Sequence, residues 1–219
     1  MPAITVSAGY GAGGSQVAKG LADRLGFRLL DRAISSLVAQ QLNVTVDEAE
    51  EGTQKRGFVE KFFGPLAAMS GAVVSSDEDA AIDAALIADN DQVFRQSAER
   101  IMRAALPAGA VILGRGGAAA LHGEPGVLTV RLYGPKDRRI AHAARVEGID
   151  AATAAERLPQ VDKARAHYVR RLYGRDIDDC ALFDLQLDST LIPTATCIDI
   201  VALAFDAVLA RQPAAAGPG

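Results

Sequence analysis

The chain has 219 residues, of which 49% are apolar, so it is long enough to bury a full hydrophobic core. Its net charge of −4 and its pI near 5.4 argue against a general surface for nucleic acid or membrane. No stretch reaches the ~18 apolar residues of a membrane span, no signal segment is visible, and the cysteines and histidines are scattered singly. We therefore expect a cytoplasmic protein with no metal cluster.

The first predicted element is a strand over residues 3–7, which runs into a glycine-rich turn from Gly9 to Gly14. A helix is predicted over residues 15–25, because Val17, Leu21 and Leu25 recur at helical spacing. Glycines let the backbone curl closely around an anion, and the start of the helix adds unpaired N–H groups. The sequence therefore predicts a site for a nucleotide phosphate at this turn.

Two templates fit these glycines. Gly9-x-Gly11-x-x-Gly14 matches a dinucleotide fingerprint, with Asp31 as the ribose-binding acid after a strand predicted over residues 27–30. The same residues have the spacing of a P-loop, but the usual lysine is missing, and Gln16 stands near the place of the magnesium-binding hydroxyl. On the glycines alone both interpretations stay open, as does a turn that serves only packing.

Three more strands are predicted, over residues 110–114, 127–133 and 182–188. Further helices are predicted over residues 32–41, 46–62, 79–105, 136–147, 151–171 and 195–211. Short apolar strands that alternate with helices are typical of a parallel sheet covered on both faces. We expect one domain over residues 1–211, with a candidate mobile insertion at 64–91, and a disordered tail over 212–219. A compact glycine-rich loop is expected between the third and fourth strands.

Polar residues follow two of these strands. Asp31 and Arg32 end the strand at 27–30, and Arg115 follows the strand at 110–114 between small residues. Ligands of an open parallel sheet bind outside the carboxyl ends of its strands, and an arginine there can hold a phosphate with its planar fork. The alternative for Arg115 is an ion pair with a carboxylate on a helix.

Basic residues concentrate again at 157–175. Lys163, His167, Arg170 and Arg171 share roughly one face at helical spacing. A run of this kind is usually a solvated helix face. It is also what a lid needs, because phosphoryl transfer requires several cations around the transferring group.

Seven motifs occur in a fixed order between about residue 3 and about residue 206. They are Tyr10-Gly11-Ala12-Gly13-Gly14, Leu30-Asp31-Arg32, Ile112-Leu113-Gly114-Arg115-Gly116-Gly117, Val130-Arg131-Leu132-Tyr133, Asp137-Arg138-Arg139, Asp162-Lys163-x-Arg165-Ala166-x-Tyr168 and Tyr173-Gly174. Together they resemble the cytidylate kinase-like family, a branch of the P-loop nucleoside monophosphate kinases. The resemblance implies a three-layer α/β/α P-loop NTPase fold, with a five-stranded parallel sheet and a helical lid at 157–175.

The resemblance also implies roles for individual residues. The donor-phosphate loop would be Gly11, Ala12, Gly13, Gly14, Ser15 and Gln16. The acceptor side would hold Asp31, Arg32 and Arg115, and the lid would carry Arg165, Arg170 and Arg171. Arg138 would face the adenine side, and the final strand would end near the donor base at Asp184 and Asp188-Ser189-Thr190. ATP and Mg²⁺ are the implied cofactors, with nucleotides as substrates and no metal ligands from the protein.

The leading hypothesis is ATP-dependent phosphoryl transfer to a nucleoside monophosphate, with CMP or dCMP first. The P-loop lysine is missing, and Lys19 lies about one helical turn too far along the chain to replace it. This motivates an alternative, a regulatory module that binds nucleotides but has weak or no phosphoryl-transfer activity. A kinase for another small molecule also remains, and a dinucleotide-dependent oxidoreductase ranks below these. The sequence leaves open whether the chain forms a homodimer.

Overall fold

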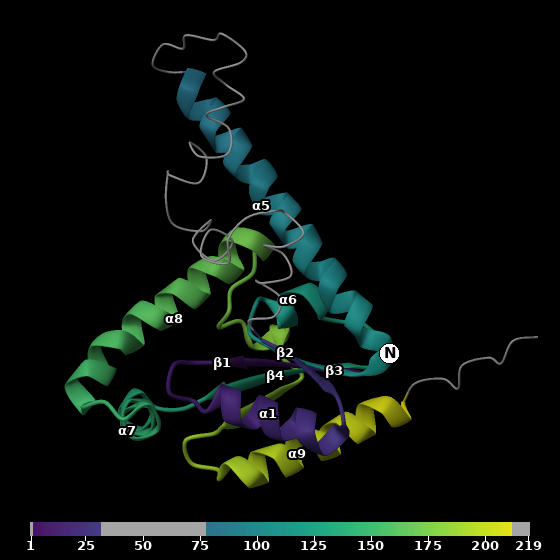
Figure 1. Cartoon of the computed structure of the whole chain (residues 1–219), viewed down its shortest axis with the longest axis vertical. Coiled ribbons are helices and arrows are strands. Elements are labelled where there is room, and N and C mark those ends of the chain that lie inside the picture. The colour runs from purple at the N-terminus through teal and green to yellow at the C-terminus, as the bar shows by residue number, and fades with distance from the viewer. Residues whose placement is uncertain (1, 32–77, 212–219) are drawn as a thin grey trace, which may run out of the picture. The chain divides into compact units, whose positions relative to one another are not determined.

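The computed structural model describes residues 2–31 and 78–211, with side chains in the second range from residue 91 onward (Figure 1). The chain divides into two compact units, one of residues 1–31 and 102–219 and one of residues 32–101. Of the second unit, the described part is the greater portion of helix α5 (Glu78–Ala105). No helix in the described ranges is long and apolar enough to cross a membrane.

The first unit is built on a five-stranded sheet with the order β2-β3-β1-β4-β5, in which all paired strands are parallel. Its strands are β1 (Ala3–Ala8), β2 (Arg28–Leu30), β3 (Ala110–Leu113), β4 (Val127–Tyr133) and β5 (Leu185–Asp188). Strand β1 lies in the centre, with Thr5 level with Ile112 on β3 and Thr129 on β4. The expected α/β fold with a five-stranded parallel sheet is confirmed.

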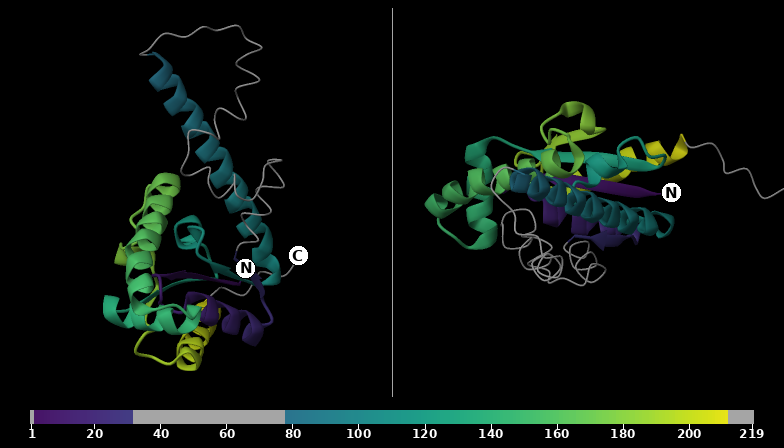
Figure 2. Two further views of the ribbon diagram at one scale, coloured as in Figure 1. Left: turned by 60° about the vertical axis from the view of Figure 1, so that its left-hand side comes forward. Right: turned by 90° about the horizontal axis from the view of Figure 1, so that it is seen from above.

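Helices cover the two faces and the carboxyl end of this sheet (Figures 1 and 2). They are α1 (Gly14–Leu25), α6 (Gly117–Leu121), α7 (Lys136–Glu147), α8 (Ala151–Tyr173) and α9 (Thr194–Ala210). Helices α1 and α9 lie on one face and α6 on the other, while α7 and α8 form a hairpin at the end opposite the start of β1. The hairpin therefore stands where the loops after the strands gather.

The main hydrophobic core fills the space between the sheet and the α1–α9 layer. It joins alternate residues of the strands, such as Ile4, Val111 and Val130, to Leu21 of α1 and Phe205 of α9. The opposite face of β1 and β4 is more polar toward its carboxyl end, where Ser7 and Arg131 are level with each other. The sheet thus presents an apolar face to one layer and polar groups near the ends of β1 and β4.

Two expectations in this region were wrong. The fifth strand, expected over 182–188, is limited to Leu185–Asp188. It starts later because Asp179 caps a 3₁₀ turn over Cys180–Leu182. In addition, the Asp184 carboxylate accepts hydrogen bonds from the backbone N–H and the hydroxyl of Thr129. The glycine-rich loop after β3 contains the short helix α6, which follows a left-handed Gly116. The helices expected at 32–41 and 46–62, the tail, and residues 64–77 of the insertion lie outside the described residues.

Candidate active site

The turn between β1 and α1, residues 9–14, has the backbone of an anion-binding loop. Gly11 and Gly13 have φ values of 74° and 69°, in the left-handed region that glycine adopts readily. Gly13 is the N-cap of α1, and no side chain caps the helix there. The Gln16 N–H donates to the Gly13 carbonyl at 3.1 Å, so the N–H groups of Gly14 and Ser15 are the ones that the first turn offers to an anion. The positive end of the helix dipole also favours an anion there.

Helix α7 packs directly against this glycine-rich loop. A Cβ atom on Gly11 would lie 2.1 Å from the backbone oxygen of Arg139, and one on Gly9 would lie 2.5 Å from Nη1 of the same residue. A Cβ on Gly13 would lie 3.4 Å from Cε1 of His142. Glycine is therefore required both for the curvature of the loop and for the approach of α7.

Tyr10 ties the loop to the α7–α8 hairpin through its backbone and its side chain. Its N–H donates to Asp162 Oδ1 at 2.8 Å, and its carbonyl accepts from Arg139 Nη1 at 3.1 Å. Its hydroxyl donates to Glu147 at 2.8 Å, and its ring packs in the small core of the hairpin. Burial, followed by the bond to Glu147, raises the pKa of Tyr10. The loop and the hairpin therefore form one packed structure.

Three arginines gather beside this loop. Arg139 donates to Asp162 Oδ2 at 2.7 Å, and Arg165 donates to the carbonyl of Ala8 at 2.8 Å. Arg131 of β4 donates to the Ser7 hydroxyl at 2.8 Å and to Asp178 at 3.0 Å. These side chains come from β4, α7 and α8 and converge on the end of β1.

The environment of the three arginines is partly desolvated. Burial lowers the pKa of Arg131 and of Arg165, although the Arg165 residue keeps part of its surface open to solvent. Arg139 and Arg165 both act on Arg131, as does the carboxylate of Asp162. An arginine remains charged even when partly buried. The cluster therefore brings fixed positive charge to the anion-binding loop.

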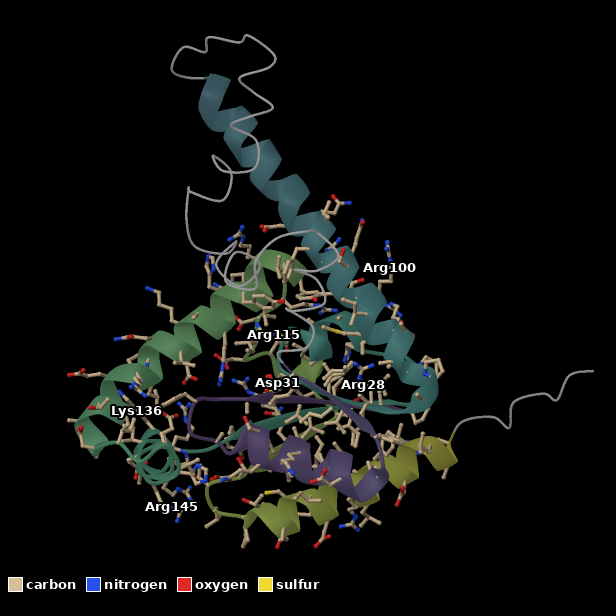
Figure 3. The ribbon with its side chains drawn as sticks, in the orientation of Figure 1. Arg28, Asp31, Arg100, Arg115, Lys136 and Arg145 are labelled. Carbon is tan, nitrogen blue, oxygen red and sulfur yellow. The ribbon has the colours of Figure 1, made fainter. Side chains whose placement is uncertain are left out.

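Arg115 joins the site from the loop after β3. Its φ of 54° makes it the only residue other than glycine with a left-handed backbone among those described, and Gly114 and Gly116 on either side are left-handed as well. Strain of this kind clusters at functional sites. Arg115 and Asp31, both labelled in Figure 3, act electrostatically on Arg165. The structure thus brings together the residues predicted after β2 and β3.

Two tyrosines of α8 border this strained turn. A Cβ on Gly116 would lie 2.3 Å from Cε2 of Tyr173, so the ring lies flush against the backbone. Burial raises the pKa of Tyr168 to about 12, while the nearby charge of Arg115 acts in the opposite direction. The C-terminal half of α8 therefore covers the Arg115 turn.

The titration of Tyr168 gives a testable pH dependence. Because its pKa is raised from 10.0 to about 12 in the folded protein, the stability that the neutral phenol provides is complete below pH 10 and is lost as the pH rises toward 12. The loss amounts to at most about 3 kcal/mol. Urea unfolding at pH 9, 10 and 11 should show a steeper loss for wild type than for Tyr168→Phe. Parallel curves would contradict the assignment.

The remaining predicted site residues lie in different surroundings. Arg138 pairs with Asp188 at 2.8 Å, at the end of β5, where Ser189 also donates to the carbonyl of Ala12. Arg170 pairs with Asp176 at 2.8 Å and keeps 71% of its side chain exposed. Arg171, the next residue, is half-buried. Ser15 and Gln16 are exposed in the first turn of α1. Arg32 lies outside the described residues. The roles expected for these residues stay predictions.

Sequence reasoning assigned no role to Tyr10, Arg131, Arg139 or Asp162. All four belong to motifs that carry the family resemblance, and that was the signal that could have found them. Their partners are far away along the chain, 152 residues in the case of Tyr10 and Asp162. Such pairs become visible only when the sheet brings the segments together.

Comparison with known proteins supports the same family. The sequence matches the model of the cytidylate kinase-like family over residues 3–191. A cytidylate kinase of Methanopyrus kandleri is 29% identical over 135 residues, which cover 58% of this chain and 70% of that protein. A uronate isomerase of Corynebacterium glutamicum is also 29% identical, over 133 residues, but these cover only 25% of that protein.

Among solved structures, an uncharacterized protein of Eubacterium ventriosum has a TM-score of 0.65 and 18% sequence identity, with 94% of this chain and 99% of that chain covered. This likeness shows a shared fold. The family match extends over most of the sequence, including β1, the glycine-rich loop, the Arg115 turn and the α7–α8 hairpin. The chain therefore belongs to the cytidylate kinase-like family.

Proposed function

We propose that the protein transfers the γ-phosphoryl group of ATP to a nucleoside monophosphate in the cytoplasm, with CMP or dCMP as the first acceptors. The observation that carries this proposal is the position of Arg165. Its guanidinium donates to the Ala8 carbonyl at the end of β1, next to the glycine-rich loop, and Arg115 and Asp31 act on the same charge. A cation at this place can contact both a donor phosphate and an acceptor phosphate. The cytidylate kinase of Methanopyrus kandleri supports the choice of a cytidine nucleotide.

Each part of the site has a role in this reaction. The N–H groups around Gly11 and Gly13 would bind the donor phosphates, and Arg115, together with Asp31, would orient the acceptor monophosphate. An oxygen of the acceptor phosphate attacks the γ-phosphorus in line, the bond from that phosphorus to the β-phosphate oxygen breaks, and ADP leaves. Arg165 would stabilise the charge that spreads over the transferring group. Arg32, Arg170 and Arg171 remain candidates for the acceptor and lid contacts.

The residues at the start of α1 fit Mg²⁺ bound with the triphosphate. Mg²⁺ usually keeps several waters and takes most of its other ligands from substrate phosphates, so it needs little from the protein. The Ser15 hydroxyl and the Gln16 amide oxygen are the side-chain oxygens that the first turn of α1 offers. When bound, the ion would neutralise charge between the β- and γ-phosphates. Arg138, paired with Asp188 beside Ser189, would lie toward the donor base.

The test is ADP formation from ATP and Mg²⁺ with CMP, dCMP, UMP, AMP and GMP offered separately. We expect turnover with a cytidine nucleotide, and Arg115→Ala should lower kcat/KM for the acceptor about a hundredfold, as expected when a charged contact to the reacting group is lost. Arg24→Ala is a matched control, because Arg24 pairs with Asp199 at the other end of α1. Unchanged kinetics in Arg115→Ala would remove Arg115 from the site.

The missing lysine favours a second candidate, a nucleotide-binding module with little or no transfer. Tight binding of ATP without ADP formation for any of the five acceptors would support it. Turnover with an acceptor other than a nucleotide would instead indicate a kinase for another small molecule.

A further inference from the structure

The glycine-rich loop lacks the cation that a P-loop normally supplies. In the P-loop pattern the lysine would stand at Ser15, and no residue from Gly9 to Gln16 is basic. Lys19, one turn further along α1, pairs with Asp23 at 3.0 Å and is 72% exposed. A cation that contacts the donor phosphates would therefore come from outside the loop and α1.

Arg139 of α7 places a guanidinium against this loop. Its Nη1 donates to the carbonyl of Tyr10 and occupies the space that a side chain at Gly9 would need. The Arg139 side chain is only 14% exposed, and its backbone oxygen abuts Gly11. The side chain of Arg139 is therefore packed against Gly9, and its backbone is packed against Gly11.

The contacts of Arg139 leave part of the guanidinium available. Both of its hydrogen bonds, to Tyr10 and to Asp162, use Nη1. Within the described part of the chain, Nε and Nη2 make no hydrogen bond. A planar guanidinium with two unused N–H edges can bind phosphate oxygens while it stays attached to the loop.

Asp162 bonds both the Arg139 guanidinium and the glycine-rich loop. One carboxylate oxygen accepts from Tyr10 N–H at 2.8 Å, and the other accepts from Arg139 Nη1 at 2.7 Å. The ion-pair partners of Arg131 and Arg139 in the described residues are Asp178 and Asp162, while Arg165 adds a third positive charge nearby. This excess of positive charge is what a bound phosphate would balance.

We propose that Arg139 takes the place of the absent P-loop lysine as a contact to the donor triphosphate, and that Asp162 is its positioning residue. This inference rests on the proposed binding of ATP at the glycine-rich loop. Lysine in a P-loop reaches the donor phosphates from the first turn of the helix, whereas Arg139 reaches them from α7. The hairpin then contributes to donor binding as well as to the lid.

The experiment compares the binding of ATP and AMP by calorimetry, together with kcat, in four variants. Arg139→Gln should lose the preference for ATP over AMP and lower kcat about a hundredfold. Arg139→Lys, which can keep the pair with Asp162, should retain the preference. Ser15→Lys, which installs a P-loop lysine, should restore ATP binding and part of kcat when combined with Arg139→Gln. Arg145→Gln, in the last turn of the same helix, is the control and should behave like wild type (Figure 3).

A second pair of variants tests the positioning role and applies even if Arg139→Gln does not fold. Asp162→Asn should lower kcat, and Ser15→Lys should rescue it, because a lysine on α1 does not need Asp162. A merely structural role of Asp162 predicts no rescue.

The outcomes of these experiments distinguish a failure of the inference about Arg139 from a failure of the proposed kinase function. The inference is overturned if Arg139→Gln binds ATP as tightly as wild type, or if Ser15→Lys does not improve kcat in Asp162→Asn. Either result leaves the proposed kinase activity intact. A wild-type protein that binds ATP through Arg139 but transfers nothing supports the inference and removes the kinase. A wild-type protein that binds no ATP overturns both.

Discussion

Gly11→Ala should abolish measurable ATP binding and destabilise the fold. Residue 11 has a φ of 74°, which costs an alanine about 1–2 kcal/mol. Its Cβ would also lie 2.1 Å from the backbone oxygen of Arg139 and 2.8 Å from the carbonyl carbon. Backbone atoms cannot move aside as a flexible side chain can, so either the loop or α7 must shift. Such overpacking typically adds about 1–3 kcal/mol.

Gly26→Ala provides the matched control. Gly26 ends α1 with a φ of 66°, so an alanine there meets the same backbone strain, but nothing lies within 4 Å of its Cβ position. We expect it to lose only about 1–2 kcal/mol and to bind ATP like wild type. Urea unfolding and calorimetry with ATP measure both effects. Equal losses in the two variants would show that the contact between the loop and α7 contributes nothing.

Phe205→Ala is expected to cause the largest loss of stability, about 3–5 kcal/mol, because it removes a fully buried aromatic ring and leaves a cavity. Phe205 belongs to the core between the sheet and α9, and its ring meets that of Phe27 edge-on with centroids 5.8 Å apart. Since the whole stability of a domain is commonly about 5–15 kcal/mol, the variant should be close to unfolding at moderate temperature.

Leu203→Ala on the same helix is the control, since Leu203 is 73% exposed. Its free energy of unfolding should stay within about 0.5 kcal/mol of wild type. Urea denaturation of both variants measures the difference. A similar effect at the two positions would mean that α9 does not pack on the sheet as described. ATP should raise the Tm of Phe205→Ala, because a ligand that binds only the folded state stabilises it by mass action.

Much of the secondary structure could be predicted from local sequence signals. The helix expected at 136–147 is Lys136–Glu147, and the strand expected at 127–133 is Val127–Tyr133. Hydrophobic periodicity and the left-handed Gly148 after the helix are local features, and they set these boundaries. The start of β5 was misplaced because Asp179 caps a turn at Cys180–Leu182, and because Asp184, between that turn and β5, is bonded to Thr129 of β4, 55 residues away.

The orientation of α8 was beyond the reach of periodicity. Helical spacing grouped Lys163, His167 and Arg170 on one face, and all three are exposed in the structure. Asp162 bonds the loop at Tyr10 and Arg165 bonds Ala8 just before it, and these two residues lie one turn apart on a different face. Periodicity tells which residues share a face, but which face meets the sheet depends on the packing of the whole helix.

The sequence by itself determined the glycine-rich loop, the parallel sheet and the arginine after β3, because glycine conformation and the pattern of apolar residues act within a few positions of the chain. Only the tertiary structure decided which side chains contact that loop. Arg139 lies 129 residues from its partner Tyr10 in the loop, and Arg165 lies 157 residues from its partner Ala8 at the end of β1. Contacts over such separations follow from the strand order and from the docking of the α7–α8 hairpin, and these arise from the packing of the whole chain.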